Sequence, residues 1–257
     1  MKDIFLSVVI PSYNEKENLQ RGVLDEVKKY LDKQKYPWEV FVSDDGSPDE
    51  ESRRLAKDFC GGNDGFIFLE NAHGGKPWAL WSGIQKATGK IILICDMDQS
   101  TPISEVEKLL PFYDQGFDVV IGSRGLERKN YSLLRRVGSV VFKVFRQFFL
   151  LPKIVDTQAG FKSFKAEIGK KIFPKLQIIK QGNTGVSGWT VGSWDAEFLF
   201  IADKESFKIK EVPVAWENRD LSMGTKKSGS GKYLQESVEM IQQIFRVRIN
   251  DLKGFYK

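Results

Sequence analysis

The sequence predicts an α/β fold in which a mostly parallel, Rossmann-like sheet is flanked by helices. Short apolar runs alternate along the first half of the chain with longer segments of helical pattern, as in proteins built from β–α–β units. The runs are almost continuously apolar, which is typical of strands covered on both faces. Polar residues follow most of these runs, at the edge where such sheets bind ligands. The predicted strands are Ile4–Pro11, Trp38–Ser43, Phe66–Leu69, Lys90–Cys95 and Phe117–Gly122.

Four helices are expected among these strands, at Glu15–Lys35, Asp49–Phe59, Lys76–Thr88 and Ser104–Gln115. The second half of the chain is less regular. It holds a strand-like segment, a helix, a strand that ends near a proline and therefore suits a sheet edge, and two amphipathic helices. In that order, these segments are Gly160–Phe164, Trp194–Ala202, Phe207–Val214, and the pair Leu133–Leu151 and Tyr233–Ile249. No repeat or boundary divides the chain, so residues 1–257 are expected to form a single domain.

Composition sets the broad class of the protein. The chain has 257 residues, of which 41% are hydrophobic and 28% charged, so it can bury a substantial core and disorder is not expected. The net charge of +5 is too small to indicate nucleic-acid binding. Cys60 and Cys95 lack metal-type spacing and suggest a reducing, cytoplasmic environment. No signal peptide or membrane-spanning apolar run is apparent, so we expect the protein to lie on a membrane at most.

Asp96 and Asp98 are the strongest chemical feature, because they follow directly after the apolar run that ends at Cys95. Two carboxylates at the end of a buried strand form a dense negative site. Oxygen ligands of this kind suit Mg²⁺ or Mn²⁺, which also bridge substrate phosphates. The alternative is a capped turn, because aspartates are common in loops.

A basic stretch, Arg128–Val155, contains no acidic residue. Within it, apolar side chains share one broad face of a helical wheel and cationic side chains share the opposite face. This pattern fits an interfacial helix on anionic lipid, and it also fits a helix packed on the core with a solvated basic face. The cations that would face the lipid are Arg135, Arg136, Lys143 and Arg146.

Several motifs together resemble the family 2 glycosyltransferases of GT-A fold. They are SVVIPSYNEKENL, VSDDGSPDES, GGKPWAL, ICDMDQST and VIGSR, in this order. Further along, VDTQAGFKSF, WDAEFLFIA and EVPVAW are similar to polyprenyl-phosphate sugar transferases, above all dolichyl-phosphate glucosyltransferases and then dolichyl-phosphate mannose synthases. The resemblance covers nearly the whole chain. It implies that residues 1–125 bind a nucleotide sugar and that residues 126–257 bind the acceptor.

The resemblance also implies roles for single residues. Pro11, Tyr13 and Glu15 would line the nucleotide pocket. Asp45 would contact the base or ribose, with Asp44 as its neighbour. The remaining binding residues would be Lys76 near the nucleotide, Asp96 near the ribose or donor sugar, and Asp98 on the metal, with Asp96 as a second candidate metal ligand.

Arg124 would face the acceptor phosphate, and Arg219 would help to hold it. Asp156 could be a catalytic base or could cap the turn that follows it. A phosphate monoester has a second pKa of about 6, so such an acceptor is already mostly anionic at neutral pH and needs no strong base.

Two motifs depart from the relatives. Mannose synthases commonly read DADxQ, and the place of their glutamine is taken here by Ser100. Pro77 and Trp78 also replace the usual small residues after the Gly-Lys pair.

The function that follows is an inverting transferase that moves glucose from UDP-glucose to a polyprenyl phosphate at the cytoplasmic face of a membrane. The metal would be Mg²⁺ or Mn²⁺, and the mannose-type donor GDP-mannose remains open. Two other functions also remain open: transfer to a saccharide or cell-envelope glycan, and a non-catalytic nucleotide-sugar scaffold at the membrane.

Overall fold

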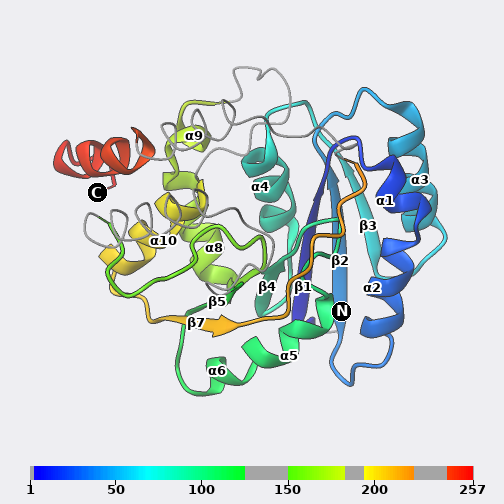
Figure 1. Ribbon diagram of the computed structural model, residues 1–257, viewed down its shortest axis with the longest axis horizontal. Helices are drawn as coiled ribbons and strands as arrows, with labels where there is room; N and C mark the ends of the chain where they lie inside the picture. Colours follow the sequence, from blue (N-terminus) through cyan, green and yellow to red (C-terminus); the bar gives the residue numbers. More distant parts are fainter. Residues whose placement is uncertain (1–2, 125–149, 183–193, 223–241, 257) are drawn as a thin grey trace, which may run out of the picture.

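A seven-stranded sheet in the strand order β3-β2-β1-β4-β6-β5-β7 forms the centre of the computed structural model (Figure 1). The structure describes residues 3–124, 150–182, 194–222 and 242–256. Neighbouring strands run parallel except around β6, which is antiparallel to both β4 and β5. The strands are β1 Leu6–Ser12, β2 Trp38–Asp44, β3 Phe66–Glu70, β4 Ile91–Ile94, β5 Val119–Ser123, β6 Lys162–Lys165 and β7 Ile209–Pro213.

Helices cover both faces of this sheet (Figure 1). The α-helices are α1 Lys16–Gln20, α2 Val23–Leu31, α3 Glu50–Gly61, α4 Lys76–Lys86, α5 Val106–Leu109, α6 Pro111–Asp114, α8 Ala166–Ile172, α9 Gln177–Lys180 and α10 Trp194–Lys204. Two 3-10 helices, η1 Ile103–Glu105 and η2 Phe173–Lys175, and a helical segment over residues 242–252 complete the described helices.

Two hydrophobic clusters, one on each face, explain why the strands are apolar throughout. Side chains alternate between the two faces of a strand. Val8 and Ile10 of β1 accordingly pack in the cluster that includes α2, α3 and α5. Val9 packs in the opposite cluster, with α4, α8, α10 and the helical segment 242–252. The predicted fold class, a mostly parallel sheet flanked by helices, is confirmed.

The site depends on where the strands end. The carboxyl ends of β1, β2, β4 and β5 share one edge of the sheet because these strands run in the same direction. The antiparallel β6 begins at that edge. Its first residue, Lys162, is in register with Ile94 on β4 and with Ile121 on β5.

Two predicted helices are divided. The segment Glu15–Lys35 contains α1 and α2, separated at Gly22, whose φ of +82° is in the left-handed region that favours glycine. The segment Ser104–Gln115 is broken into short turns before Pro111, which lacks the amide proton for a continuous helix.

The seven predicted strands and the helix at Trp194–Ala202 are confirmed, and Phe207–Val214 contains the edge strand β7. Helices α8 and α9 were not predicted. Most of the amphipathic helix expected at Leu133–Leu151 lies outside the described residues. Of the helix expected at Tyr233–Ile249, the structure describes the part from residue 242 onward. No helix in the described ranges is both long and apolar enough to cross a membrane.

Candidate active site at the carboxyl edge of the sheet

The acidic turn after β4 is held in shape by its own residues. Met97 is buried in the core, while Asp96 and Asp98 on either side of it are partly exposed. Oδ1 of Asp98 accepts a hydrogen bond from the backbone N–H of Ser100 at 2.8 Å, and Oδ2 accepts one from the Ser100 hydroxyl, also at 2.8 Å. Gln99 takes a φ of +50° and is buried. The two carboxylates are therefore presented together at the sheet edge.

Asp96 is surrounded by cations. Its Oδ1 lies 2.5 Å from Nζ of Lys76, the first residue of α4. Burial alone would raise the pKa of Asp96, but Lys76, Lys162 and Arg124 outweigh it and hold that pKa below its usual value. On the other side, a Cβ added to Gly160 would lie 1.8 Å from Oδ2 of Asp96. A side chain at position 160 would therefore displace the Asp96 carboxylate.

Asp98 and Glu15 are less well compensated. Burial raises the pKa of Asp98, and the charges of Asp96 and Asp220 raise it further against the hydrogen bonds from Ser100. Burial also raises the pKa of Glu15 to about 8, against a hydrogen bond from Asn18, and the other three carboxylates add to the rise. Buried carboxylates that repel one another are stabilised by a bound cation.

Asp45 lies beneath a loop rather than at the surface. Its side chain is 0% exposed and accepts hydrogen bonds from the backbone N–H groups of Gly74, at 2.9 Å, and Gly75, at 2.8 Å. Nδ1 of His73 lies 2.9 Å from Oδ2 of Asp45, and the His73 ring stacks on Tyr13 with 4.8 Å between centroids. Asp45 thus fixes the loop that leads into α4. The predicted contact between Asp45 and the donor would require this loop to move.

Asp44 and Pro11 also lie inside the protein. Asp44 is buried, and its carboxylate accepts hydrogen bonds from the backbone N–H of Ser47, at 3.0 Å, and from its hydroxyl, at 2.6 Å. Pro11 belongs to the buried strand β1. These two residues shape the ends of β1 and β2. Among the residues predicted to line the nucleotide pocket, partly exposed side chains belong to Tyr13, Glu15 and Lys76.

Arg124 and Asp156 form a bidentate ion pair. Nε of Arg124 lies 2.8 Å from Oδ2 of Asp156, and Nη2 lies 2.9 Å from Oδ1. Although burial opposes it, Arg124 holds the pKa of Asp156 well below its usual range. A carboxylate of such low pKa is a weak base, so the geometry favours a turn-fixing role for Asp156. The guanidinium of Arg124 also lies 5.8 Å from the ring centroid of Trp216.

Arg219 reaches the acidic turn through its backbone. Its N–H donates to the Ser100 hydroxyl at 3.1 Å, and the N–H of Glu217 donates to the Ser100 carbonyl at 2.9 Å. Its guanidinium is directed elsewhere, to Glu26 on α2, with contacts of 2.8 and 3.0 Å. The predicted contact of Arg219 with the acceptor would require this exposed ion pair to open.

Lys162 and Asp195 were not predicted as site residues. Lys162 is 0% exposed, and its Nζ lies 2.6 Å from Oδ1 of Asp195. Trp194 packs in the core, and Glu197 is buried and accepts a hydrogen bond from the hydroxyl of Tyr256. A lysine in an apolar strand was the one sequence signal for this pair.

Comparison with known proteins decides the family. The sequence model described as Glycosyl transferase family 2 matches residues 7–173, which is more than half of the chain. The chain belongs to this family. This family 2 glycosyltransferase is 30% identical to the dolichyl-phosphate beta-glucosyltransferase of Dictyostelium discoideum, over 99% of its own length and 77% of the relative's. It is 32% identical to the human protein of the same name, over 82% of its own length and 67% of the relative's.

Solved structures share the fold. Glucosyl-3-phosphoglycerate synthase of Mycobacterium tuberculosis, solved with Mn²⁺, UDP-glucose and glycerol 3-phosphate, matches with a TM-score of 0.61 and 17% identity. The match covers 96% of this chain and 79% of that one. A mannosyltransferase of Pyrobaculum calidifontis, solved with GDP-mannose and Mn²⁺, matches with a TM-score of 0.53 and 20% identity. This match covers 83% of the present chain and 58% of the mannosyltransferase. The predicted GT-A fold is confirmed.

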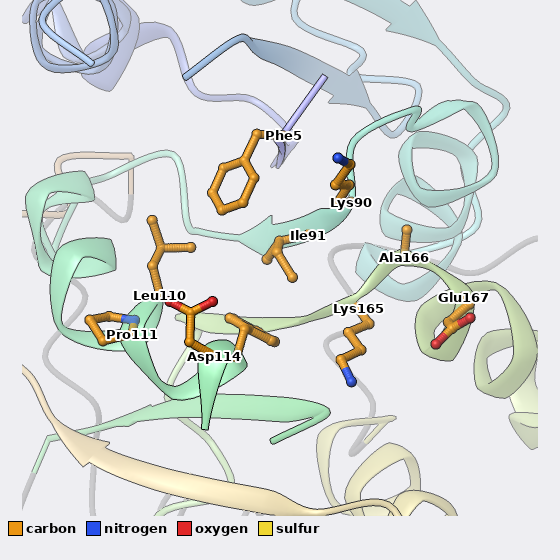
Figure 2. A pocket seen from close by; sticks show the side chains of 10 residues that line it. Phe5, Lys90, Ile91, Leu110, Pro111, Asp114, Lys165, Ala166 and Glu167 are labelled. Carbon is orange, nitrogen blue, oxygen red and sulfur yellow. The ribbon is translucent and has the colours of Figure 1, made fainter. Parts of the chain in front are cut away.

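The glycosyltransferase also has a hollow at the opposite edge of the sheet (Figure 2). It lies where β4 begins and β6 ends, and its lining includes Phe5, Ile91, Leu110 and Lys165. Asp96 and Asp98 follow the other end of β4, so this hollow is separate from the acidic site.

Arg124 of this glycosyltransferase should serve the acceptor more than the donor. Arg124→Lys keeps the charge but loses the bidentate fork, so transfer should fall on the order of tenfold. Calorimetry should show donor affinity within about twofold of the wild type, since this contact would then be made to a different ligand. The matched control is Arg54→Lys on α3, an exposed residue paired with Asp58. An equal loss of donor affinity would assign Arg124 to the diphosphate instead.

Proposed function

We propose that the protein is an inverting transferase that moves glucose from UDP-glucose to a polyprenyl phosphate. The observation that carries this proposal is the pairing of the acidic turn at Asp96 and Asp98 with the cation Arg124 at the same sheet edge. An acidic turn suits a metal-bound diphosphate, and a separate cation suits a second anion, the acceptor phosphate. The likeness to dolichyl-phosphate beta-glucosyltransferases supports the choice of sugar and lipid.

The metal would be Mg²⁺ or Mn²⁺, held by Asp98 with Asp96 beside it. No group of three or more metal-binding side chains converges among the described residues. Mg²⁺ typically takes one or two carboxylates and completes its shell with water and substrate phosphates. The raised pKa values of Asp98 and Glu15 support this assignment, because a bound cation would relieve the repulsion among these neighbouring carboxylates. When bound, the metal would neutralise charge on the leaving diphosphate.

The donor would lie over the ends of β1 and β2. Tyr13, stacked on His73, offers an aromatic surface beside the loop that Asp45 fixes. Asp44 and Pro11 would support this pocket from within. Lys76 would keep Asp96 ionised and in place near the ribose or sugar.

The acceptor phosphate would be held by Arg124. A phosphate that is already anionic needs orientation rather than deprotonation, because its oxygen is itself the nucleophile. The low pKa of Asp156 agrees with this chemistry. Asp156 would hold Arg124 in place as an ionised carboxylate and would not act as a base. Arg219 would approach the acceptor if its pair with Glu26 opened.

We further propose peripheral contact with the cytoplasmic face of a membrane. The basic segment Arg128–Lys153 would provide it, and that segment lies mostly outside the described residues. Support within the described chain comes from the helical segment 242–252, where Ile249 is 47% exposed and Leu252 is 85% exposed. Arg246 lies near them on the same helix and is also exposed. Exposed apolar side chains flanked by cations suit the interface of an anionic bilayer.

The function is tested by presenting purified protein with a panel of nucleotide sugars and a short polyprenyl phosphate. With UDP-glucose we expect a polyprenyl phosphate that carries a β-linked glucose. Turnover of UDP-galactose, UDP-N-acetylglucosamine and GDP-mannose should be markedly slower. Losing one hydrogen bond to a sugar hydroxyl can cost about 1–3 kcal/mol, so a single contact is enough to determine which sugar is preferred. Faster turnover of GDP-mannose would overturn the donor, and hydrolysis of the donor without transfer to the polyprenyl phosphate would overturn the acceptor.

Membrane contact is tested by co-sedimentation with anionic vesicles. Binding should weaken when Arg135, Arg136, Lys143 and Arg146 are all replaced by Glu, and also when salt is raised. The control replaces surface cations of α3, namely Arg53, Arg54 and Lys57, by Glu and should bind like the wild type. Absence of wild-type binding to anionic vesicles would contradict the membrane proposal.

A further inference from the structure

Lys162 is a fully buried lysine at the point where the sheet reverses direction. It is the first residue of β6, in register with Ile94 and Ile121 on the strands at its two sides. Its side chain is 0% exposed, and its Nζ lies 2.6 Å from Oδ1 of Asp195. The ammonium also donates to the carbonyl oxygen of Ala159 and lies 5.5 Å from the ring centroid of Trp194.

Stability alone is a poor reason for this pair. Lysine is almost never fully buried unless it is paired. Taking an ammonium and a carboxylate out of water is unfavourable for each ion, and apolar residues of similar volume often replace such pairs without loss of stability. The neighbours Phe161 and Phe164 show that apolar side chains fill this strand readily. The charges of Lys162 and Asp195 therefore call for another role.

The segment that carries Lys162 lies directly against Asp96. Gly160 approaches Asp96 so closely that a side chain at position 160 would displace the carboxylate. The charge of Lys162 acts on Asp96 together with that of Lys76, and Asp195 is influenced by Lys76, Lys162 and Asp96 in turn. Lys76 comes from α4, Lys162 from β6 and Asp195 from α10. Three separate elements are thus joined electrostatically around one carboxylate of the candidate active site.

We propose that Lys162, paired with Asp195, is a positioning residue that fixes the Asp96 carboxylate for the nucleotide-sugar donor. The inference rests on the proposed function, because it assumes that Asp96 faces the donor. Lys162 acts through Asp96 and makes no contact with substrate, since it has no exposed surface. The reversal of strand direction at β6 is what brings this lysine to the carboxyl edge of β4 and β5.

The test separates stability from positioning by removing the pair in two stages. Lys162→Met leaves the carboxylate of Asp195 buried and uncompensated, so both the melting temperature and kcat should fall. The double variant Lys162→Met with Asp195→Leu removes both charges and should recover most of the melting temperature. Its kcat for donor hydrolysis should remain lower than that of the wild type by about tenfold or more, with a smaller change in donor KM.

Lys165→Met is the matched control. Lys165 lies on the same strand and pairs with Asp118 at 2.8 Å, at the edge of the sheet away from Asp96. Its kcat should stay within about twofold of the wild type, because this pair touches no site residue.

A double variant with the kcat of the wild type would overturn the proposal, because the pair would then have no part in positioning Asp96. If the double variant fails to fold, Asp195→Asn decides the matter, since it keeps the shape and removes the charge. A fall in kcat of about fivefold or more at a temperature where Asp195→Asn is folded supports positioning, and an unchanged kcat contradicts it.

The readout is hydrolysis of the nucleotide-sugar donor in the absence of lipid. The donor is UDP-glucose or GDP-mannose, whichever the wild type hydrolyses faster, and the kcat of each variant is compared with that of the wild type. The proposed function fails separately, where the wild type transfers no sugar to polyprenyl phosphate.

Discussion

Asp96 lies where three parts of the chain meet: the end of β4, the start of α4 through Lys76, and the start of β6 through Gly160 and Lys162. Asp96 is partly exposed, and nearby cations favour its charged form against the partial loss of its hydration. Lys76 comes from the start of α4 and Arg124 follows β5, and the reversal of β6 between two parallel neighbours adds Lys162. The same reversal places the segment before β6, which contains Asp156, beside Arg124 at the end of β5.

The charges at this edge are arranged so that binding of a metal and an anion completes them. Asp96 is compensated by fixed lysines, whereas Asp98 and Glu15 have raised pKa values in the protein alone. A divalent cation would relieve the repulsion around Asp98, and the donor diphosphate would complete its coordination. Arg124 stands apart, fixed by Asp156, as the cation for a second anion. This division of charge is what a transfer between two phosphorylated molecules requires.

Local sequence patterns were sufficient to predict the strands and the fold class. Polar residues after the predicted strands pointed to Asp98 and Arg124 as candidates, because strand ends converge in a parallel sheet, and the family resemblance added Lys76. The missing parts depend on distant contacts. The place of His73 depends on its contacts with Asp45 and Tyr13, and that of Lys162 on its ion pair with Asp195. The Arg219 side chain is directed by its ion pair with Glu26 on α2. No spacing rule in a single sequence reveals such pairs.

Mn²⁺ affinity in the presence of UDP tests the metal–diphosphate site most directly, because it needs neither the correct sugar nor the lipid. Titration calorimetry would compare the wild type with Asp98→Asn, which keeps the shape of the side chain and removes its charge. Asp58→Asn on α3, 64% exposed, is the control. We expect Asp98→Asn to weaken Mn²⁺ binding by about tenfold or more and Asp58→Asn to leave it unchanged. Equal Mn²⁺ affinity in all three proteins would contradict a metal site at Asp98.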